Sequence, residues 1–129
     1  MSERPLILVS NDDGVFAPGC IALREALSSI GEVVTVAPAN QQSAGSHAIT
    51  LDRPVRAHRI DDGVYAVDGT PADCIYVGLF YGDILSRKPD VVVSGINHGP
   101  NLGNDVFYSG TVAAAREGAF RGIPSVAFS

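Results

Sequence analysis

Near its start the chain reads LILVS at residues 6–10 and NDDG at residues 11–14. The short, mostly aliphatic run favours a buried strand, and parallel strands of open α/β sheets present their carboxyl ends to the ligand crevice. Asp12 and Asp13 would then place two like charges at that edge, where a hard divalent metal ion could stabilise both of them. The alternative for residues 11–14 is an Asx turn closed by Gly14.

Length and composition indicate one globular domain. The chain has 129 residues, of which 46% are hydrophobic, and this is enough for a sizeable core. The net charge of −5 argues against an extended surface for nucleic acid or anionic membranes. Neither a signal peptide nor a membrane span is evident, and Cys20 and Cys74 are typical of reduced core thiols in a cytoplasmic protein. Because Ser129 directly follows a predicted buried strand, we expect residues 1–129 to lack a C-terminal segment.

Helical and strand patterns alternate along the chain. After Gly14, one apolar stripe is typical of a helix that ends at Gly31, and its members are Cys20, Leu23, Leu27 and Ile30. Residues 33–37, 91–94 and 125–128 are typical of further parallel strands, and residues 112–121 are typical of a helix.

The middle of the chain has a different period. Residues 48–51, 55–60 and 64–67 alternate apolar with polar side chains, which predicts a half-exposed antiparallel hairpin whose turn contains Asp61 and Asp62. Residues 70–73, TPAD, then predict a capped helix start. The whole order predicts an α/β fold: a Rossmann-like three-layer sandwich with a mostly parallel sheet and an inserted β-hairpin.

Polar segments follow four of the predicted strands, at residues 11–14, 40–45, 68–71 and 94–101. Carboxyl ends of parallel strands share one sheet edge, so the polar side chains of three of these segments can converge there. The oxygen ligands available are Asp12, Asp13, Ser43 and Asn97. Such a set suits Mg²⁺, Mn²⁺ or Ca²⁺ better than zinc.

Two predicted helix starts could hold an anion. Ser109, Gly110 and Thr111 precede an alanine-rich stretch and combine helix-start N–H groups, two hydroxyls and a glycine that permits close approach. Gly69 and Thr70 could contribute a second such start, although ordinary capping explains either one alone.

Two further residue patterns bear on the ligand. His98, beside Asn97, is a candidate substrate contact, whereas His58 is typical of an ordinary surface residue. The glycines of residues 95–103 do not have the spacing of dinucleotide binders, so we expect no organic cofactor.

Five ordered motifs together carry a family resemblance: residues 9–14, 37–45, 69–74, 94–101 and 109–111. With them the chain resembles the SurE family of survival-protein nucleotidases over essentially its whole length. The resemblance implies a 5′-nucleotidase, a divalent-metal-dependent phosphatase acting on nucleoside 5′- and 3′-monophosphates.

The resemblance also implies roles for single residues. Asp12 and Asp13 would be catalytic, and Asp12, Asp13, Ser43 and Asn97 would hold one Mg²⁺ or Mn²⁺. Asn11, Ser43 and residues 109–111 would face the phosphate. Family members are longer than this chain, and the part that they have in addition is associated with subunit exchange and with covering the site. A homodimer or homotetramer is therefore expected of the full-length form.

Two other functions remain open at this point. A receiver-like phosphoacceptor domain also has an acidic pair after its first strand, but it needs an Asp after the third parallel strand, where this chain has Ser94 and Gly95. A non-catalytic metal- and nucleotide-binding module, or an inactive fragment of a phosphatase, would share every ligand named above. Turnover of a nucleotide separates that module from the enzyme.

Overall fold

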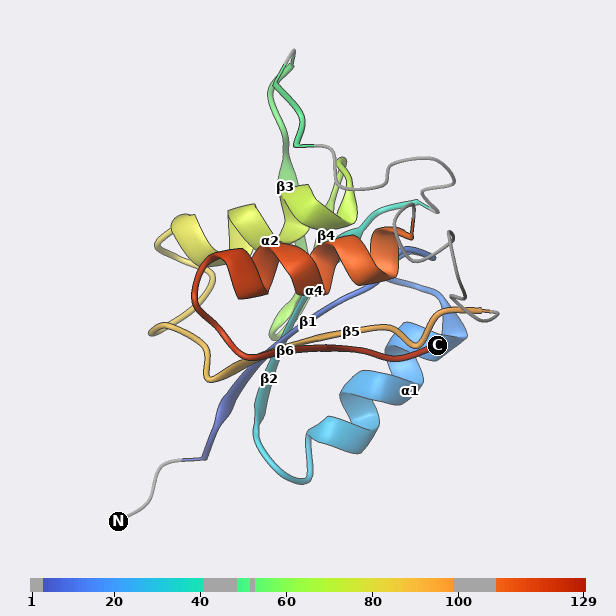
Figure 1. Cartoon of the computed structure of the whole chain (residues 1–129), viewed down its shortest axis with the longest axis vertical. Helices are drawn as coiled ribbons and strands as arrows, with labels where there is room; N and C mark the ends of the chain where they lie inside the picture. Colours follow the sequence, from blue (N-terminus) through green and yellow to red (C-terminus); the bar gives the residue numbers. More distant parts are fainter. Residues whose placement is uncertain (1–3, 41–48, 52, 99–108) are drawn as a thin grey trace.

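The computed structural model describes residues 4–40, 49–51, 53–98 and 109–129. Strands and helices alternate along most of the chain (Figure 1). In chain order they are β1 (Leu6–Ser10), α1 (Pro18–Leu27), β2 (Glu32–Pro38), β3 (Ala57–Asp61), β4 (Val64–Val67), α2 (Pro71–Phe80), β5 (Val91–Ser94), α4 (Gly110–Phe120) and β6 (Ser125–Ala127).

The strands form one six-stranded sheet in the order β3-β4-β2-β1-β5-β6. Strand β1 pairs in parallel with both β2 and β5, and β4 and β6 extend the sheet in the same direction. Among the described strands only β3 runs antiparallel, against β4. Helix α1 covers one face of the sheet, and α2 and α4 cover the other (Figure 1). The predicted α/β sandwich with a mostly parallel sheet is confirmed.

Side chains of β1 alternate between two cores. Leu6 and Leu8 pack into the cluster beneath α2 and α4, whereas Ile7 and Val9 pack into the cluster beneath α1. All five residues of β1 are buried, which explains why its sequence is continuously apolar up to Ser10. Because successive side chains of a strand point to opposite faces, Ser10 belongs to the face of Leu8.

The end of α1 differs from the prediction. The helix ends at Leu27 with Ser28 as its C-cap, and Ile30 lies beyond it with 61% of its surface exposed. Gly31 is buried, and a Cβ there would lie 2.6 Å from the Pro5 carbonyl oxygen. Gly31 therefore makes room for a crossing of two chain segments, and its N–H donates to the Leu27 carbonyl at the helix end at 3.1 Å. The apolar periodicity alone predicted a helix about one turn longer than the structure has.

The hairpin region confirms one expectation and corrects another. Its turn has Gly63 at a φ of 68° and a carboxylate oxygen of Asp61 accepting from the Asp62 N–H at 2.8 Å, so the second Asp pair is turn chemistry. Residues 49–51, predicted as alternating strand, form no strand; they are tied to α2 instead. The parallel pairing of β4 with β2 also brings residues 68–71 to the carboxyl edge, which the hairpin pattern did not predict.

Strand β6 is an edge strand, contrary to the expectation of a buried one: Val126 is 43% exposed. Both cysteines are free and buried, as predicted. Among the described residues, no helix has the length and apolar character needed to cross a membrane.

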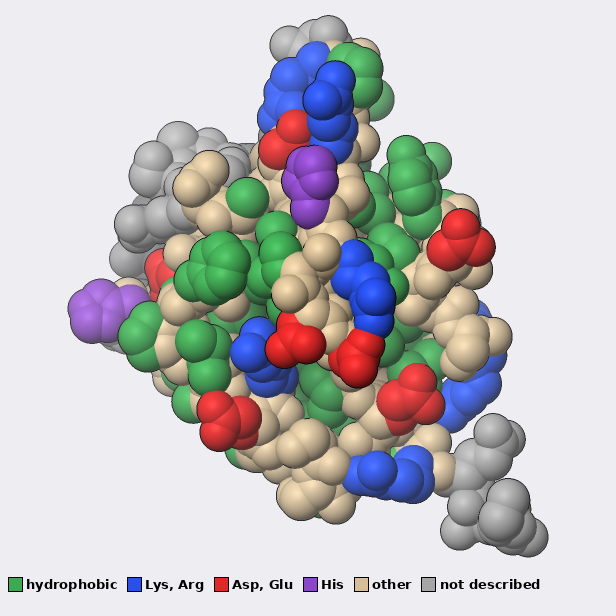
Figure 2. Space-filling model, turned by 180° about the vertical axis from the view of Figure 1, so that it is seen from behind, with side chains coloured by type: hydrophobic (Ala, Val, Ile, Leu, Met, Phe, Trp, Pro, Cys, Tyr) green, Lys and Arg blue, Asp and Glu red, His purple; other side chains and the backbone are tan. Residues whose placement is uncertain are grey.

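Charged side chains of both signs alternate on the face shown in Figure 2. Several surface arginines have a carboxylate partner close by, in the pairs Arg53–Asp68, Arg59–Asp62 and Arg87–Asp90. The charges of these arginines are therefore balanced locally rather than gathered into one basic surface.

Leu8 tests the central core. It is fully buried between β2 and β5, so Leu8→Ala should lower the free energy of unfolding by about 2–5 kcal/mol. Leu51→Ala is the matched control, because Leu51 is 90% exposed and its loss should change stability by less than about 0.5 kcal/mol. Urea denaturation measures both, and equal effects would contradict the described packing.

Candidate functional site

Three segments meet at the carboxyl edge of the sheet: residues 11–14 after β1, residues 95–98 after β5, and the start of α4. The backbone N–H of His98 donates to Asp13 at 3.0 Å, and the Thr111 hydroxyl donates to the Asn97 amide oxygen at 3.2 Å. Gly110 lies directly against the Asp12 carboxylate. The structure therefore brings together the predicted residues of these three segments, whereas Ser43 lies outside the described residues.

Asn11 fixes the loop that carries the two aspartates. Its side chain is fully buried, donates to the Gly14 carbonyl at 2.7 Å and accepts from the Gly14 N–H at 3.3 Å. The Val15 N–H donates to the Pro38 carbonyl and ties the loop to β2. An Asx-type turn therefore exists, but Asn11 closes it. The carboxylates of Asp12 and Asp13 are not used to hold the turn.

The surroundings of Asp12 disfavour its ionised carboxylate. Its buried Oδ1 has no hydrogen-bond partner among the described residues. Burial, followed by the charge of Asp13, raises the pKa of Asp12 to about 6. Both causes penalise the ionised form, and a nearby cation would offset both of them.

Gly110 leaves the space that Asp12 occupies. A Cβ at Gly110 would collide with the Asp12 carboxylate and would lie 2.9 Å from Cγ of Pro71. The starts of α2 and α4 are therefore neighbours, and Asp12 lies against the start of α4. The predicted close approach at Gly110 exists, but toward a carboxylate of the chain itself.

The start of α4 has the form expected of an anion site. The Ser109 side chain caps the helix by accepting from the Val112 N–H at 3.2 Å, and the first turn contains no acidic residue. Thr111 is fully buried and holds Asn97. The first N–H groups of a helix have no partner within the helix, so this terminus presents donors and a partial positive charge.

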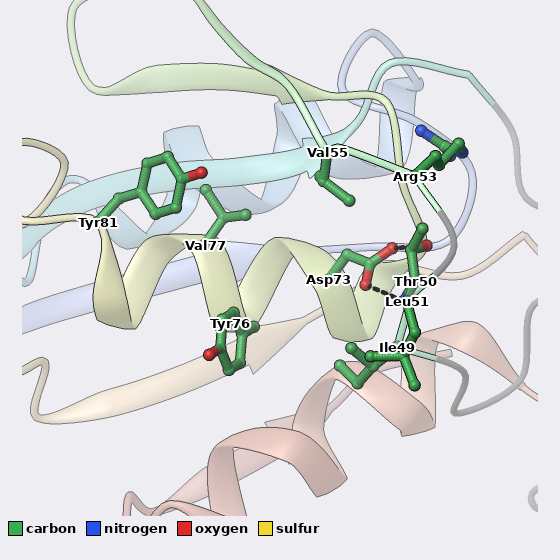
Figure 3. Close-up of a pocket in the computed structure, with 9 residues that line it drawn as sticks. All are labelled: Ile49, Thr50, Leu51, Arg53, Val55, Asp73, Tyr76, Val77 and Tyr81. Carbon is green, nitrogen blue, oxygen red and sulfur yellow. Dashed lines mark hydrogen bonds between the residues drawn. The ribbon is translucent and has the colours of Figure 1, made fainter.

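The start of α2 is also capped within the chain, but it has an acidic residue, Asp73, in its first turn. Thr70 and Asp73 form the predicted capping box, and the Asp73 carboxylate also accepts from the N–H and the hydroxyl of Thr50. Figure 3 shows these two bonds at one end of a cavity of about 340 Å³, which also has Tyr76 and Tyr81 in its walls. Because the Asp73 carboxylate is fully engaged, this cavity offers no unpartnered carboxylate for a cation.

A second cavity, of about 490 Å³, adjoins the aspartates. Asp13, Asn97 and His98 line it together with the start of α1. A cavity of this size suits a small molecule, and His98 borders it as a substrate contact would. Among the described residues, no three His, Cys, Asp or Glu side chains cluster as a metal site, so a cation here needs amide or hydroxyl oxygens as well as the two carboxylates.

Comparison with known proteins assigns the family. The model of the family described as survival protein SurE matches residues 7–129. The chain belongs to the SurE family.

Individual relatives agree with this assignment. A protein named 5′-nucleotidase SurE from Sorangium cellulosum is 62% identical over 98% of this chain and 49% of its own length, and one from Geotalea uraniireducens is 58% identical over 95% and 49%. The crystal structure of SurE protein from Aquifex aeolicus has a TM-score of 0.87 at 51% identity, covering 97% of this chain and 52% of that one. The chain thus spans about half the length of these SurE relatives.

Sequence reasoning missed two contacts of the site. The Thr111–Asn97 bond and the packing of Gly110 on Asp12 join segments far apart in the chain, and no local pattern encodes them. It also passed over Ser10 and Ser94 as the last residues of strands. Side chains two residues apart in a strand point to the same face. Ser10 therefore shares a face with the buried Leu8, and Ser94 shares a face with the buried Val92.

The raised pKa of Asp12 predicts a pH-dependent effect in the metal-free chain. The folded-state pKa lies above that of the unfolded chain, so this group favours folding at low pH, and its contribution is lost as the pH rises from about 4 to about 7. Asp12→Asn should therefore raise the urea midpoint at pH 8 and have little effect at pH 4. Asp83→Asn, at an exposed position, is the control. An Asp12→Asn variant no more stable than the unmodified chain at pH 8 would contradict the described environment.

Proposed function

We propose that this chain is the metal- and phosphate-binding part of a divalent-metal-dependent phosphatase that hydrolyses nucleoside 5′- and 3′-monophosphates to nucleoside and phosphate. The observation that carries the proposal is the unpartnered, buried Oδ1 of Asp12, beside a second carboxylate and against the start of α4. The relatives named 5′-nucleotidase SurE support the same activity.

The residues at this edge fit a hard cation. Asp12 has an orphaned oxygen, Asp13 is a second carboxylate, and Asn97 adds an amide oxygen. We propose that these three and Ser43 hold one Mg²⁺ or Mn²⁺, for which Ca²⁺ can substitute in a crystal. When bound, the ion would supply Lewis-acid chemistry at a phosphoryl oxygen.

The chain's own groups bind and orient the substrate. We assign the phosphate to Ser109, Gly110 and Thr111, because the start of α4 offers backbone donors and has no acidic residue in its first turn. Asn11, Gly69 and Thr70 were predicted as further phosphate contacts. Asn11 is bonded to Gly14, and Asp73 places a carboxylate in the first turn of α2, whereas the first turn of α4 has no acidic residue, so α4 is the better terminus for the phosphate.

Asp12 and Asp13 are the proposed catalytic carboxylates. In the metal-free chain, burial and the charge of Asp13 raise the pKa of Asp12 to about 6, and a bound cation would favour the ionised form that serves as a ligand. The His98 N–H holds Asp13 in place at 3.0 Å, and the adjoining cavity takes the nucleoside, with the His98 side chain at its border. No organic cofactor is needed, because positioning and charge stabilisation account for most of the catalysis of phosphoryl transfer.

The remaining parts of the proposal concern the longer protein. We expect a cytoplasmic enzyme that assembles as a homodimer or homotetramer in its full-length form. A non-catalytic metal- and nucleotide-binding module is less favoured, because relatives at 62% and 58% identity carry the name of an enzyme.

The activity is tested by phosphate release from 5′-AMP, 5′-GMP and 3′-AMP, with and without Mn²⁺. Release should require the metal, and Asp12→Asn should abolish it and weaken Mn²⁺ binding in calorimetry by at least about tenfold, because a charged ligand is lost. The same assay on a longer SurE relative shows whether the remaining half is needed for turnover. Mn²⁺ binding without release from either protein would leave the binding module as the better account.

Gly110→Ala probes the contact between α4 and Asp12. The added Cβ forces the Asp12 carboxylate to move, so calorimetry should show Mn²⁺ affinity reduced by about tenfold or more. Gly82→Ala is the control, since a Cβ at Gly82 meets nothing within 4 Å. Equal Mn²⁺ affinities of the two variants would mean that Asp12 is not a ligand in the described position.

A further inference from the structure

Four buried side-chain oxygens have no hydrogen-bond partner within the described part of the chain. They are Ser10 Oγ, Asp12 Oδ1, Thr35 Oγ1 and Ser94 Oγ. Buried polar groups are nearly always hydrogen-bonded, and the exceptions concentrate at functional sites and at places where a water or an ion binds. Four such atoms on three adjacent strands and the loop that follows β1 therefore call for a physical explanation.

Two of the hydroxyls are neighbours on one face of the sheet. Ser10 and Ser94 are register partners in the parallel pair β1–β5, and both are fully buried. Leu8 and Val92, two residues before them, pack in the core beneath α2 and α4. Alternation therefore places both hydroxyls under these helices, on strands about 4.8 Å apart.

Asp12 lies next to the same face. It follows Ser10 by two residues, and its carboxylate lies against Gly110 at the start of α4, close to the start of α2. Ser10 faces α2 as well: its hydroxyl lies near the Cys74 thiol and lowers the pKa of that thiol, although burial raises this pKa more. That contact does not reach hydrogen-bond geometry, and a thiol is a weak partner in any case.

Thr35 lies on the opposite face of the sheet. Its neighbours along β2, Val34 and Val36, belong to the core beneath α2 and α4, so the Thr35 side chain points toward α1. It is as buried and as unpartnered as the two serines, but it is separated from Asp12 by the sheet. It is therefore a matched control for them.

We propose that Ser10 and Ser94 are positioning residues that hold Asp12 through one shared buried water. The water would bond to both hydroxyls and donate to Asp12 Oδ1, which gives it three polar partners, a usual number for a buried water. This water would hold the Asp12 carboxylate in place as a metal ligand. The inference rests on the proposed function, in which Asp12 is a metal ligand, and it adds the groups that hold this ligand in place.

Calorimetric titration with Mn²⁺ tests the proposal on the whole chain. Ser10→Ala and Ser94→Ala should each weaken Mn²⁺ binding by about 10–100-fold, as the loss of a group that holds a metal ligand usually does. The double variant should be little weaker than either single variant, because each change removes the same water. Thr35→Val, which removes the orphan hydroxyl of the other face, should leave Mn²⁺ affinity unchanged.

Several outcomes would overturn the inference. Unchanged Mn²⁺ affinity in the serine variants would do so, and so would an equal loss in Thr35→Val, which would indicate general loosening of the sheet. Additive losses in the double variant would mean that the two hydroxyls act separately. If the unmodified chain binds no Mn²⁺, the proposed function fails and this inference fails with it. Binding that the serine variants do not alter defeats only the inference.

A crystal structure of the Mn²⁺-loaded, unmodified chain gives a readout that no folding defect can disturb. A water within hydrogen-bond distance of both serine hydroxyls and of Asp12 would support the proposal. A direct bond from either hydroxyl to the Asp12 carboxylate, or no water between them, would refute it.

Discussion

The parallel pairing of β1 with β2 on one side and β5 on the other is the interaction on which the rest of the structure depends. Parallel strands end at the same edge, so the loop after β1 and the loop after β5 emerge side by side. The bonds between these loops and the start of α4, from His98 to Asp13 and from Thr111 to Asn97, are possible only because of that shared direction. A single antiparallel partner in the place of β5 would carry Asn97 to the opposite edge of the sheet.

At this edge, polar groups that are hydrogen-bonded within the chain favour the fold, and those without a partner cost free energy. Asn11 satisfies the turn, and Asp73 satisfies the start of α2. Asp12 has a raised pKa, and one of its oxygens has no partner among the described residues. A buried group without its hydrogen bond costs about 1–3 kcal/mol. Asp12 carries this cost at the edge where a ligand would meet the chain, and the hydroxyls of Ser10, Thr35 and Ser94 carry it within the sheet.

Local patterns in the sequence predicted what depends on local physics. The aliphatic run of β1, the capping box at Thr70 and the turn before Gly63 each follow from neighbours within a few residues. The features that the sequence patterns predicted wrongly depend on residues far away in the chain. Ile30 continues the stripe of α1 in sequence, yet the chain has already turned toward β2, and Gly31 is needed for the crossing with Pro5. Residues 49–51 alternate like a strand, but Asp73 of α2 binds them in place of a neighbouring strand.

The position of Asp12 at the start of α4 supports the proposed cation site on electrostatic grounds. Its partial positive charge and backbone donors favour a phosphate, but the Asp12 carboxylate already lies against Gly110 at the same terminus. Two anions cannot share a helix end of about half an elementary charge without strong repulsion, and Asp13 adds a third negative group nearby. A divalent ion between the carboxylates and the phosphate would attract each of these anions and so offset their mutual repulsion. The position of Asp12 at the helix start therefore supports the proposed metal dependence, whereas at the start of α2 the acidic residue, Asp73, belongs to the capping box.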